Sequence, residues 1–192
     1  MGRTSKLDHA QAVDQMMRYF WRNGYYPTTV RNLSDALGVN APSLYHAFGD
    51  KETMYVGAVK HYVAIFDDQM TRILSTKRTN REKLTDLIIM AWDDPTLPDG
   101  CLVIDLLGEQ PSLSAALSRP VNDLFAKHLA QIQALLVLEQ TAGRLKATVN
   151  VQTAAQILLS VHNGLQSVIK DPDYPLSAAT ITADTLALFY QN

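Results

Sequence analysis

Glycines and prolines divide the N-terminal part of the chain into short segments, and this punctuation constrains the fold more than any other feature. Residues 8–23 place apolar side chains at i, i+3, i+4, i+7 and i+8, which forms one face of an amphipathic helix. Gly24 follows at the position of a C-terminal cap. Gly38 and Gly49 end two further segments. The region is therefore predicted to hold three short helices and the start of a longer fourth one.

The second and third segments, at residues 28–48, have the pattern of a helix-turn-helix. Thr28 or Thr29 can cap the second helix. Gly38 can supply the positive φ that a tight turn needs, and Asn40 can cap the third helix. The pattern therefore predicts two short helices joined by a glycine turn, with the third helix available to a ligand.

Apolar side chains fix which face of the third helix points outward. Val39 and Leu44 are expected to pin this helix to the core. The side chains left to face outward are Ala41, Pro42, Ser43, Tyr45 and His46. None of them is Arg or Lys, so the common bidentate contact with guanine is not available from this helix.

The remainder of the chain is predicted to form longer helices, and no segment shows convincing strand alternation. A loop is expected at residues 93–100, which are rich in Asp and Pro. The predicted helices cover residues 50–75, 80–93, 101–109, 112–140 with a bend near Pro120, 151–170 and 177–191. The expected fold is all-α with about nine helices, divided into domains at 1–55 and 56–192.

Composition argues against several classes of protein. The 192 residues are 47% hydrophobic, which is enough to bury a core. No apolar run approaches the ~20 residues of a membrane helix, and the N-terminus lacks the apolar stretch of a signal peptide. Cys101 is the single cysteine, so no internal disulfide can form. We expect a cytoplasmic protein without a membrane partner.

From Pro27 to Tyr55 the chain closely resembles the TetR family of bacterial transcriptional regulators. The stretches TTVRNLSDALGV, PSLYHAF and GDKETMY follow the family pattern almost position by position. The resemblance implies an N-terminal three-helix DNA-binding domain and a larger C-terminal domain for ligand binding and dimerisation. It also implies a regulator, most simply a repressor, that a small molecule releases from a pseudo-palindromic operator.

The resemblance also implies which residues contact double-stranded DNA. The N-terminus of the second helix would hold a phosphate, the start of the third would enter the major groove, and a lysine at the start of the fourth would clamp a phosphate. The residues implied are Thr28, Thr29, Asn40, Ala41, Pro42, Ser43, Tyr45, His46 and Lys51. We add Arg31 for its charge and expected exposure. Alternatively, Tyr45 is a half-buried core residue, and His46 and Lys51 are ordinary surface residues.

Charge alone gives little support to DNA binding. Residues 1–55 hold six Lys or Arg and five Asp or Glu, and the rest of the chain holds eleven and fourteen. The asymmetry has the sign that DNA binding requires, but it is small. Readout is therefore expected to depend on Tyr45, His46, thymine-methyl contacts and DNA shape.

The last two helices have apolar faces broader than one intramolecular contact needs. We expect these faces to form a homodimer, which would present two headpieces to two half-sites. The candidate interface residues are Leu158, Val161, Leu165, Val168, Leu186 and Phe189. The alternative is a larger monomer core.

The remaining helices are expected to enclose an effector pocket. Inward-pointing candidates are Tyr62, Phe66, Trp92, Phe125, His128, His162 and Gln166. Plain core packing is the alternative for each of them. Cys101 follows a glycine at a helix start, where the helix dipole can lower a thiol pKa, so a redox or electrophile sensor is a second hypothesis. An inert packed cysteine is the alternative.

Two other classes of protein compete with a regulator. An enzyme is disfavoured because the chain has no HExxH motif, no phosphate-binding glycine loop and no nucleophile elbow. No metal and no cofactor is predicted. A helical adaptor that binds only protein would not need Thr28, Tyr45 and Lys51 on one surface. Induction is expected to act through the helix at 50–75, which belongs to both predicted domains.

Overall fold

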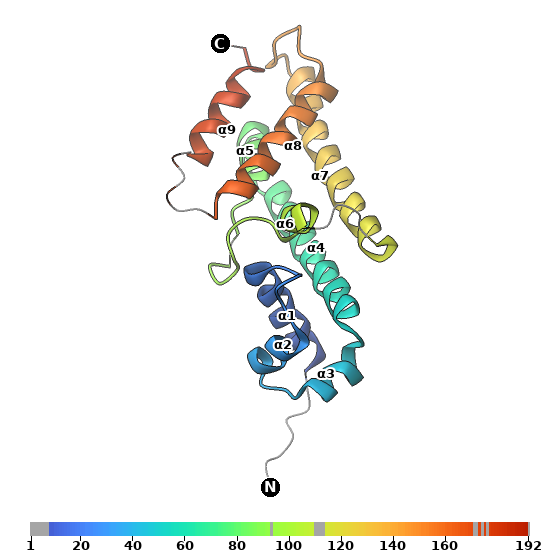
Figure 1. The fold of residues 1–192 in the computed structure, drawn as a ribbon. Coiled ribbons are helices and arrows are strands. Elements are labelled where there is room, and N and C mark those ends of the chain that lie inside the picture. Colours follow the sequence, from blue (N-terminus) through green and yellow to red (C-terminus); the bar gives the residue numbers. More distant parts are fainter. Residues whose placement is uncertain are drawn as a thin grey trace. The chain divides into compact units, whose positions relative to one another are not determined.

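The computed structural model describes residues 8–92, 94–109, 114–170, 173, 175 and 177–191. Within these ranges it contains nine α-helices and no β-strand, which confirms the expected all-α fold. The helices are α1 (His9–Asn23), α2 (Val30–Leu37), α3 (Ala41–Phe48), α4 (Lys51–Ser75), α5 (Asn80–Ile89), α6 (Leu102–Glu109), α7 (Ala115–Thr141), α8 (Val151–Val168) and α9 (Ala178–Ala187), labelled in Figure 1.

Side-chain caps define where most of these helices begin. The side chain of Asp8 accepts from two amides of α1, and that of Asn150 accepts from the Thr153 amide of α8. Asp50 precedes α4 and accepts from the amide of Thr53 at 2.8 Å. Each cap satisfies amides that have no partner inside the helix. The N-terminal boundaries could therefore be predicted from local sequence.

Several C-terminal boundaries differ from the prediction. The helix expected at 80–93 ends at Ile89, because Met90 adopts a left-handed conformation with φ of 47°. The last helix ends at Ala187 and not at 191. There the chain pairs with the segment that follows α7, and the amide of Lys146 donates to the carbonyl of Phe189 at 2.9 Å. The expected start of α7 at 112 and residue 93 of the predicted loop lie outside the described residues.

The helices pack into two compact units, each with its own core. Unit 1 comprises the described residues of 1–65 and 101–120, so it contains α1 to α3, the first part of α4, and α6. Unit 2 comprises those of 66–100 and 121–192. The predicted domains are 1–55 and 56–192, whereas the packing units divide after Ile65 and place residues 101–120 in unit 1.

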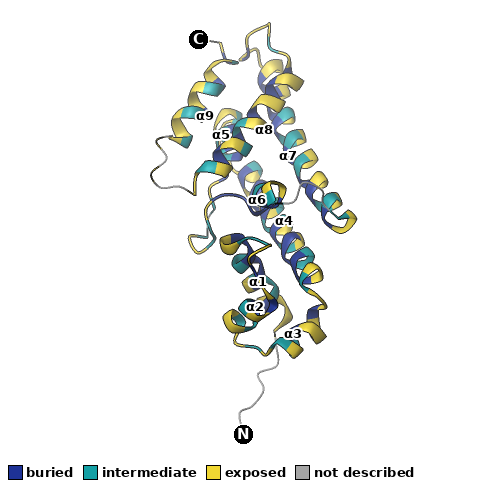
Figure 2. Ribbon diagram, viewed as in Figure 1, coloured by how far each residue is buried: buried dark blue, intermediate teal, exposed yellow. Residues whose placement is uncertain are grey.

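Each unit buries the apolar face of its helices and exposes the other face, as Figure 2 shows. The core of unit 1 includes Met16, Phe20, Leu33 and Leu44, and the core of unit 2 includes Leu84, Leu87, Ile132, Leu158 and Leu186. Among the described residues, no helix is both long enough and apolar enough to cross a membrane.

Candidate DNA-binding surface

The turn between α2 and α3 has the geometry that the sequence predicts. Gly38 ends α2 in the left-handed conformation with φ of 65°. The hydroxyl of Ser34 donates to the carbonyl of Val39 at 2.5 Å, which closes the turn. Asn40 then caps α3 by accepting from the amide of Ser43 at 2.9 Å. The two helices are therefore held in a helix-turn-helix arrangement by backbone and capping interactions.

The N-terminus of α2 is closed by a side-chain cap. Thr29 and Asn32 form a reciprocal capping box, in which each side chain accepts from the backbone amide of the other residue. The box uses the amides of Thr29 and Asn32, so the amides of Val30 and Arg31 remain at the helix end without a partner inside the helix. Exposed amides at a helix N-terminus are a favourable site for phosphate.

The outward face of α3 contains the residues that the sequence predicted for it. Tyr45 is 53% exposed, which excludes the alternative of a half-buried core position. Pro42 and His46 are also exposed, whereas Ala41 and Ser43 are half-buried. On the opposite face Leu44 and Phe48 are buried, as expected for the residues that fix α3 to unit 1. The other predicted contacts that lie just before α3 or at the start of α2 are also exposed: Asn40, Thr29 and Arg31.

Thr28 differs from the other predicted DNA contacts because its side chain is buried. It is only 1% exposed, and its hydroxyl donates to the carbonyl of Gly24 at 2.6 Å. This hydrogen bond stabilises the turn between α1 and α2. Thr29, and not Thr28, provides the cap of α2. The sequence could not distinguish the two, because either threonine can cap a helix.

Lys51 lies at the first position of α4, over the turn between α1 and α2. Its ammonium lies 4.2 Å from the centre of the Tyr25 ring and 3.4 Å from the carbonyl oxygen of Tyr26. Burial lowers the pKa of Lys51, and the nearby carboxylate of Glu109 opposes this shift. Tyr26 is 63% exposed beside it. Sequence reasoning did not single out Tyr25 or Tyr26.

A carboxylate from α6 holds the same turn from within unit 1. Glu109 accepts from the amide of Tyr25 at 2.8 Å, across 84 residues of sequence. Gly24 has φ of 80°, and a Cβ added there would meet the Glu109 carboxylate. Gly24 is therefore favoured for its backbone conformation, and a larger residue there would displace the Glu109 side chain. No local sequence pattern could have identified this contact.

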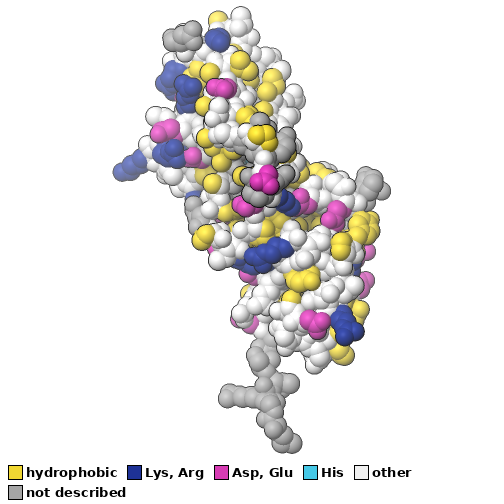
Figure 3. Space-filling view, turned by 60° about the vertical axis from the view of Figure 1, so that its left-hand side comes forward, with side chains coloured by type: hydrophobic (Ala, Val, Ile, Leu, Met, Phe, Trp, Pro, Cys, Tyr) yellow, Lys and Arg dark blue, Asp and Glu magenta, His cyan; other side chains and the backbone are white. Residues whose placement is uncertain are grey.

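Surface charge gives no large basic patch on the face that Figure 3 shows. Lys and Arg side chains, drawn in dark blue, are interspersed with Asp and Glu, drawn in magenta. This agrees with the small charge asymmetry in the sequence.

Several of the predicted effector-binding residues cap the C-terminal end of α5 in unit 2. His128 and His162 donate to the carbonyls of Leu87 at 3.1 Å and Ile88 at 2.9 Å, and Gln166 donates to that of Ile89 at 2.8 Å. These carbonyls have no amide partner within the helix, so buried side chains satisfy them. The roles observed for these three residues are therefore structural.

The two histidines also belong to an aromatic cluster with Phe66 and Trp92. The rings of His128 and His162 lie 4.6 Å apart edge to face, and Phe66 lies 5.4 Å from His128 and 6.0 Å from Trp92. Burial lowers the pKa of His128 to about 3 and that of His162 to about 4. Phe125 is half-buried on α7. The described residues contain no group of three or more His, Cys, Asp or Glu side chains that could hold a metal.

Cys101 and Tyr62 are buried together in unit 1. The Tyr62 hydroxyl donates to the Cys101 sulfur at 3.0 Å, and the cysteine is 3% exposed. Burial raises the pKa of Cys101, which is opposite to the direction in which a helix dipole would shift it. The desolvation of the thiolate outweighs the favourable position near a helix start. The observations favour the alternative of an inert packed cysteine.

Half of the predicted dimer residues are core residues of unit 2. Leu158, Leu165 and Leu186 are at most 5% exposed within the single chain. Val161, Val168 and Phe189 are half-buried. The larger apolar side chains that stay exposed in and after α8 and α9 are Ile157, Ile169 and Leu188, at 42%, 40% and 66%. A dimer face on these helices would therefore use exposed and half-buried side chains such as Ile157 and Val161 more than the buried leucines.

Comparisons with known proteins point to the same class of molecule. Residues 13–58, which contain most of α1, all of α2 and α3 and the start of α4, match the family model described as bacterial regulatory proteins, tetR family. Over 171 residues the chain is 26% identical to the HTH-type transcriptional repressor ComR of Escherichia coli K12. This match covers 85% of the chain and 80% of ComR.

Solved structures share the fold of the whole chain. A cysteine-substituted form of the TetR-family regulator CifR, solved with a 26-bp operator duplex, has a TM-score of 0.78 and 22% identity, over 98% of this chain and 100% of that one. A protein from Saccharomonospora viridis, solved in complex with choline, has a TM-score of 0.79 and 15% identity, over 95% and 97%.

A helix-turn-helix that matches this family model, within a fold shared with solved regulators, indicates the class of DNA-binding transcriptional regulators. Residues 13–58 match the model of the tetR family of bacterial regulatory proteins, and the chain is similar to regulators of that family in sequence and in fold. The resemblance of residues 27–55 to that family is thereby confirmed.

Proposed function

We propose that this chain is a ligand-responsive repressor that binds a pseudo-palindromic operator as a homodimer. The observation that carries the proposal is the surface formed by the α2 N-terminus and the outward face of α3. There Tyr45 and His46 are exposed on a helix whose opposite face is buried. The relative ComR is named as a repressor, and the related CifR was solved with operator DNA, which supports this proposal.

The residues divide between positioning the DNA and distinguishing its bases. The Val30 and Arg31 amides, the Arg31 side chain and Lys51 would bind phosphates, as would the exposed Tyr26 beside Lys51. The residues of α3 would reach the major groove, with Tyr45 and His46 at base edges or phosphates and Pro42 near thymine methyl groups. Thr28 would act only by stabilising the turn.

A homodimer would give the two recognition helices that a palindrome requires. On α8, Ile157, Val161, Gly164 and Val168 recur at the spacing of one helical face, and the exposed Ile157 lies on it. Two copies of this face would bury apolar surface that the single chain leaves in water. We therefore assign the dimer contact to this face and not to the buried Leu158 and Leu165.

Ligand response would depend on α4, because this one helix has residues in both units. It begins with Lys51 in unit 1 and continues through Gln69 and Ile73, which line a pocket in unit 2. A ligand that binds one position of α4 better than another would shift the equilibrium between operator-bound and free states.

The test is selection of bound sequences from random duplexes, followed by fluorescence anisotropy on the enriched sequence. An inverted repeat is expected, with a binding isotherm that depends on dimer concentration. Tyr45→Ala should weaken binding to the selected site, whereas Lys77→Gln, an exposed change in unit 2, should not. Absence of any enriched sequence would contradict the proposed function.

A further inference from the structure

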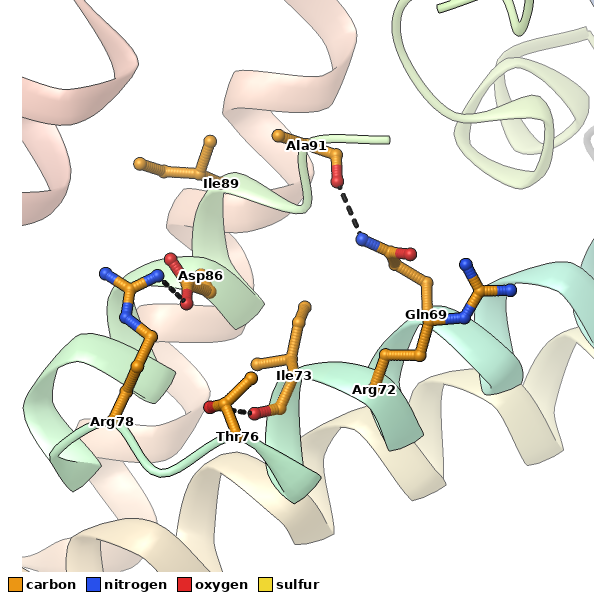
Figure 4. Close-up of a pocket in the computed structure, with 8 residues that line it drawn as sticks. All are labelled: Gln69, Arg72, Ile73, Thr76, Arg78, Asp86, Ile89 and Ala91. Carbon is orange, nitrogen blue, oxygen red and sulfur yellow. Dashed lines mark hydrogen bonds and ion pairs between the residues drawn. The ribbon is translucent and has the colours of Figure 1, made fainter. Parts of the chain in front are cut away.

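A pocket of about 400 Å³ opens in unit 2 beside the C-terminal part of α4 and α5, and Figure 4 shows the residues that line it. This volume lies within the range of small-molecule sites, roughly 300–1,000 Å³. Its apolar wall consists of Ile73, Ile89 and Ala91. Its charged groups are Arg72, Arg78 and Asp86, of which Arg72 is paired with Asp68 and Arg78 with Asp86.

The backbone acceptors of this pocket already have donors. The carbonyl of Ile73 accepts from the Thr76 hydroxyl at 2.8 Å, and that of Ala91 accepts from the Gln69 amide at 2.9 Å. The carbonyl of Ile89 accepts from Gln166 at 2.8 Å. Two helices end here, but side-chain donors already satisfy these carbonyl groups, so a cationic ligand would find few free acceptors.

Arg78 in contrast offers more donors than its partners use. A guanidinium has five N–H groups. One nitrogen of Arg78 donates to Asp86 at 2.5 Å, and another lies 3.9 Å from Glu82. The Arg78 side chain is 48% exposed. The Asp86 side chain is 26% exposed, so solvent partly screens this ion pair and a ligand oxyanion can compete with Asp86 for Arg78.

We propose that this pocket binds a small organic acid, with its carboxylate or phosphate oxygens on Arg78 and its apolar body against Ile73 and Ile89. A planar guanidinium matches either oxyanion in a bidentate manner. The side-chain oxygen of Gln69, a residue that lines the pocket, can accept from a donor elsewhere on the ligand (Figure 4). The ligand's role as effector rests on the proposed function, but its binding does not.

The test is calorimetric titration of the full chain with benzoate, phenyl phosphate, inorganic phosphate and benzyl alcohol. Binding should require both the oxyanion and the ring, so inorganic phosphate and benzyl alcohol are expected to bind more weakly than the two aromatic anions. The ratio of benzoate to phenyl phosphate affinity then assigns the oxyanion class. Equal affinity for benzyl alcohol and benzoate would overturn the proposal.

Variants give a test of sign as well as size. Arg78→Gln should weaken benzoate binding by roughly tenfold or more, since it removes a charge-assisted hydrogen bond. Asp86→Asn should tighten benzoate binding, because it removes the carboxylate that competes with the ligand for Arg78. Lys77→Gln removes a neighbouring exposed charge that does not line the pocket, and it should leave binding unchanged.

The opposite pattern would refute an anion site. Weaker binding in Asp86→Asn would show that the carboxylate is the anchor, and unchanged binding in Arg78→Gln would show that Arg78 does not contact the ligand. Operator release is measured separately by anisotropy. Benzoate binding that depends on Arg78 but leaves operator affinity unchanged would support the pocket and contradict the proposed induction.

Discussion

The contact between Glu109 and the α1–α2 turn predicts that α6 controls how Lys51 is presented to DNA. Glu109 binds the amide of Tyr25, the Tyr25 ring lies under the Lys51 ammonium, and the next carbonyl, that of Tyr26, accepts from Lys51. Glu109→Ala should release the turn, and operator affinity should fall. Glu109→Gln retains an oxygen that can accept from the same amide, so its affinity should stay close to that of the native chain.

The magnitude follows from the type of hydrogen bond. A hydrogen bond to a charged group contributes about 1.5–3 kcal/mol, and since Glu109 is half-buried we expect about 1–2 kcal/mol from it. For a chain of this size a loss of 1 kcal/mol lowers the Tm by about 2–4 °C. If one Lys51–phosphate contact is lost per headpiece, the slope of log K against log salt should fall by about 0.9 per contact.

The assay is fluorescence anisotropy with operator duplex over a series of salt concentrations, with thermal unfolding in parallel. An electrostatic role alone predicts that both Glu109 variants bind more tightly, because each removes a negative charge near phosphate. A positioning role predicts that Glu109→Ala alone binds more weakly and with a smaller salt slope. If Glu109→Ala shows native affinity and native slope, the reasoning is refuted, whereas a native chain that binds no operator would instead refute the proposed function.

Other residues give predictions that are independent of Glu109. Thr29→Ala removes the capping box of α2 and should cost about 1 kcal/mol of unfolding free energy, measured by urea denaturation. Cys101 should resist alkylation in the folded chain and react on unfolding, as mass spectrometry would detect, because burial raises its pKa and excludes reagent. Rapid alkylation under native conditions would restore the sensor hypothesis. The folded chain holds His128 and His162 neutral, with pKa values of about 3 and about 4, against about 6.5 when unfolded. Their contribution to stability is therefore full above about pH 6.5 and is lost as the pH falls toward 4, and His162→Gln should flatten this dependence.

Local sequence was sufficient to predict the elements of the headpiece. Asp8, Thr29 and Asn40 cap helices through contacts within three residues, and Gly38 forms its turn without distant partners. Exposure of Tyr45 followed from the burial of its neighbour Leu44, one position away on a helix. These interactions are short in sequence, so their pattern is visible in a single chain.

Contacts between distant segments could not be predicted in this way. Glu109 gave no signal because its partner Tyr25 lies 84 residues away. The early end of α5 at Ile89 depends on Met90 adopting positive φ, which its residue type does not favour. Leu158 and Leu165 were assigned to a dimer because an apolar face does not reveal whether its partner is another helix of the same chain.

The polar residues of unit 2 show how one buried helix end constrains where a ligand can bind. The carbonyls at the end of α5 must be satisfied, and side chains from α7 and α8 satisfy them: His128, His162 and Gln166. A ligand that took these donors would leave buried carbonyls unsatisfied, at about 1–3 kcal/mol for each. A ligand in the pocket beside Arg78 avoids this cost, because Arg78 has N–H groups that its protein partners do not occupy.

Gln69 connects that pocket to the same helix end. Its amide donates to the carbonyl of Ala91, just beyond α5, while the residue itself lies on α4. A ligand that engages Gln69 would therefore act on the hydrogen bond between α4 and the segment after α5. Gln69→Leu should retain the bulk of the side chain, lose this bond, and weaken any coupling between acid binding and operator affinity. If the coupling stays at its native value in Gln69→Leu, α4 does not receive the ligand through this residue.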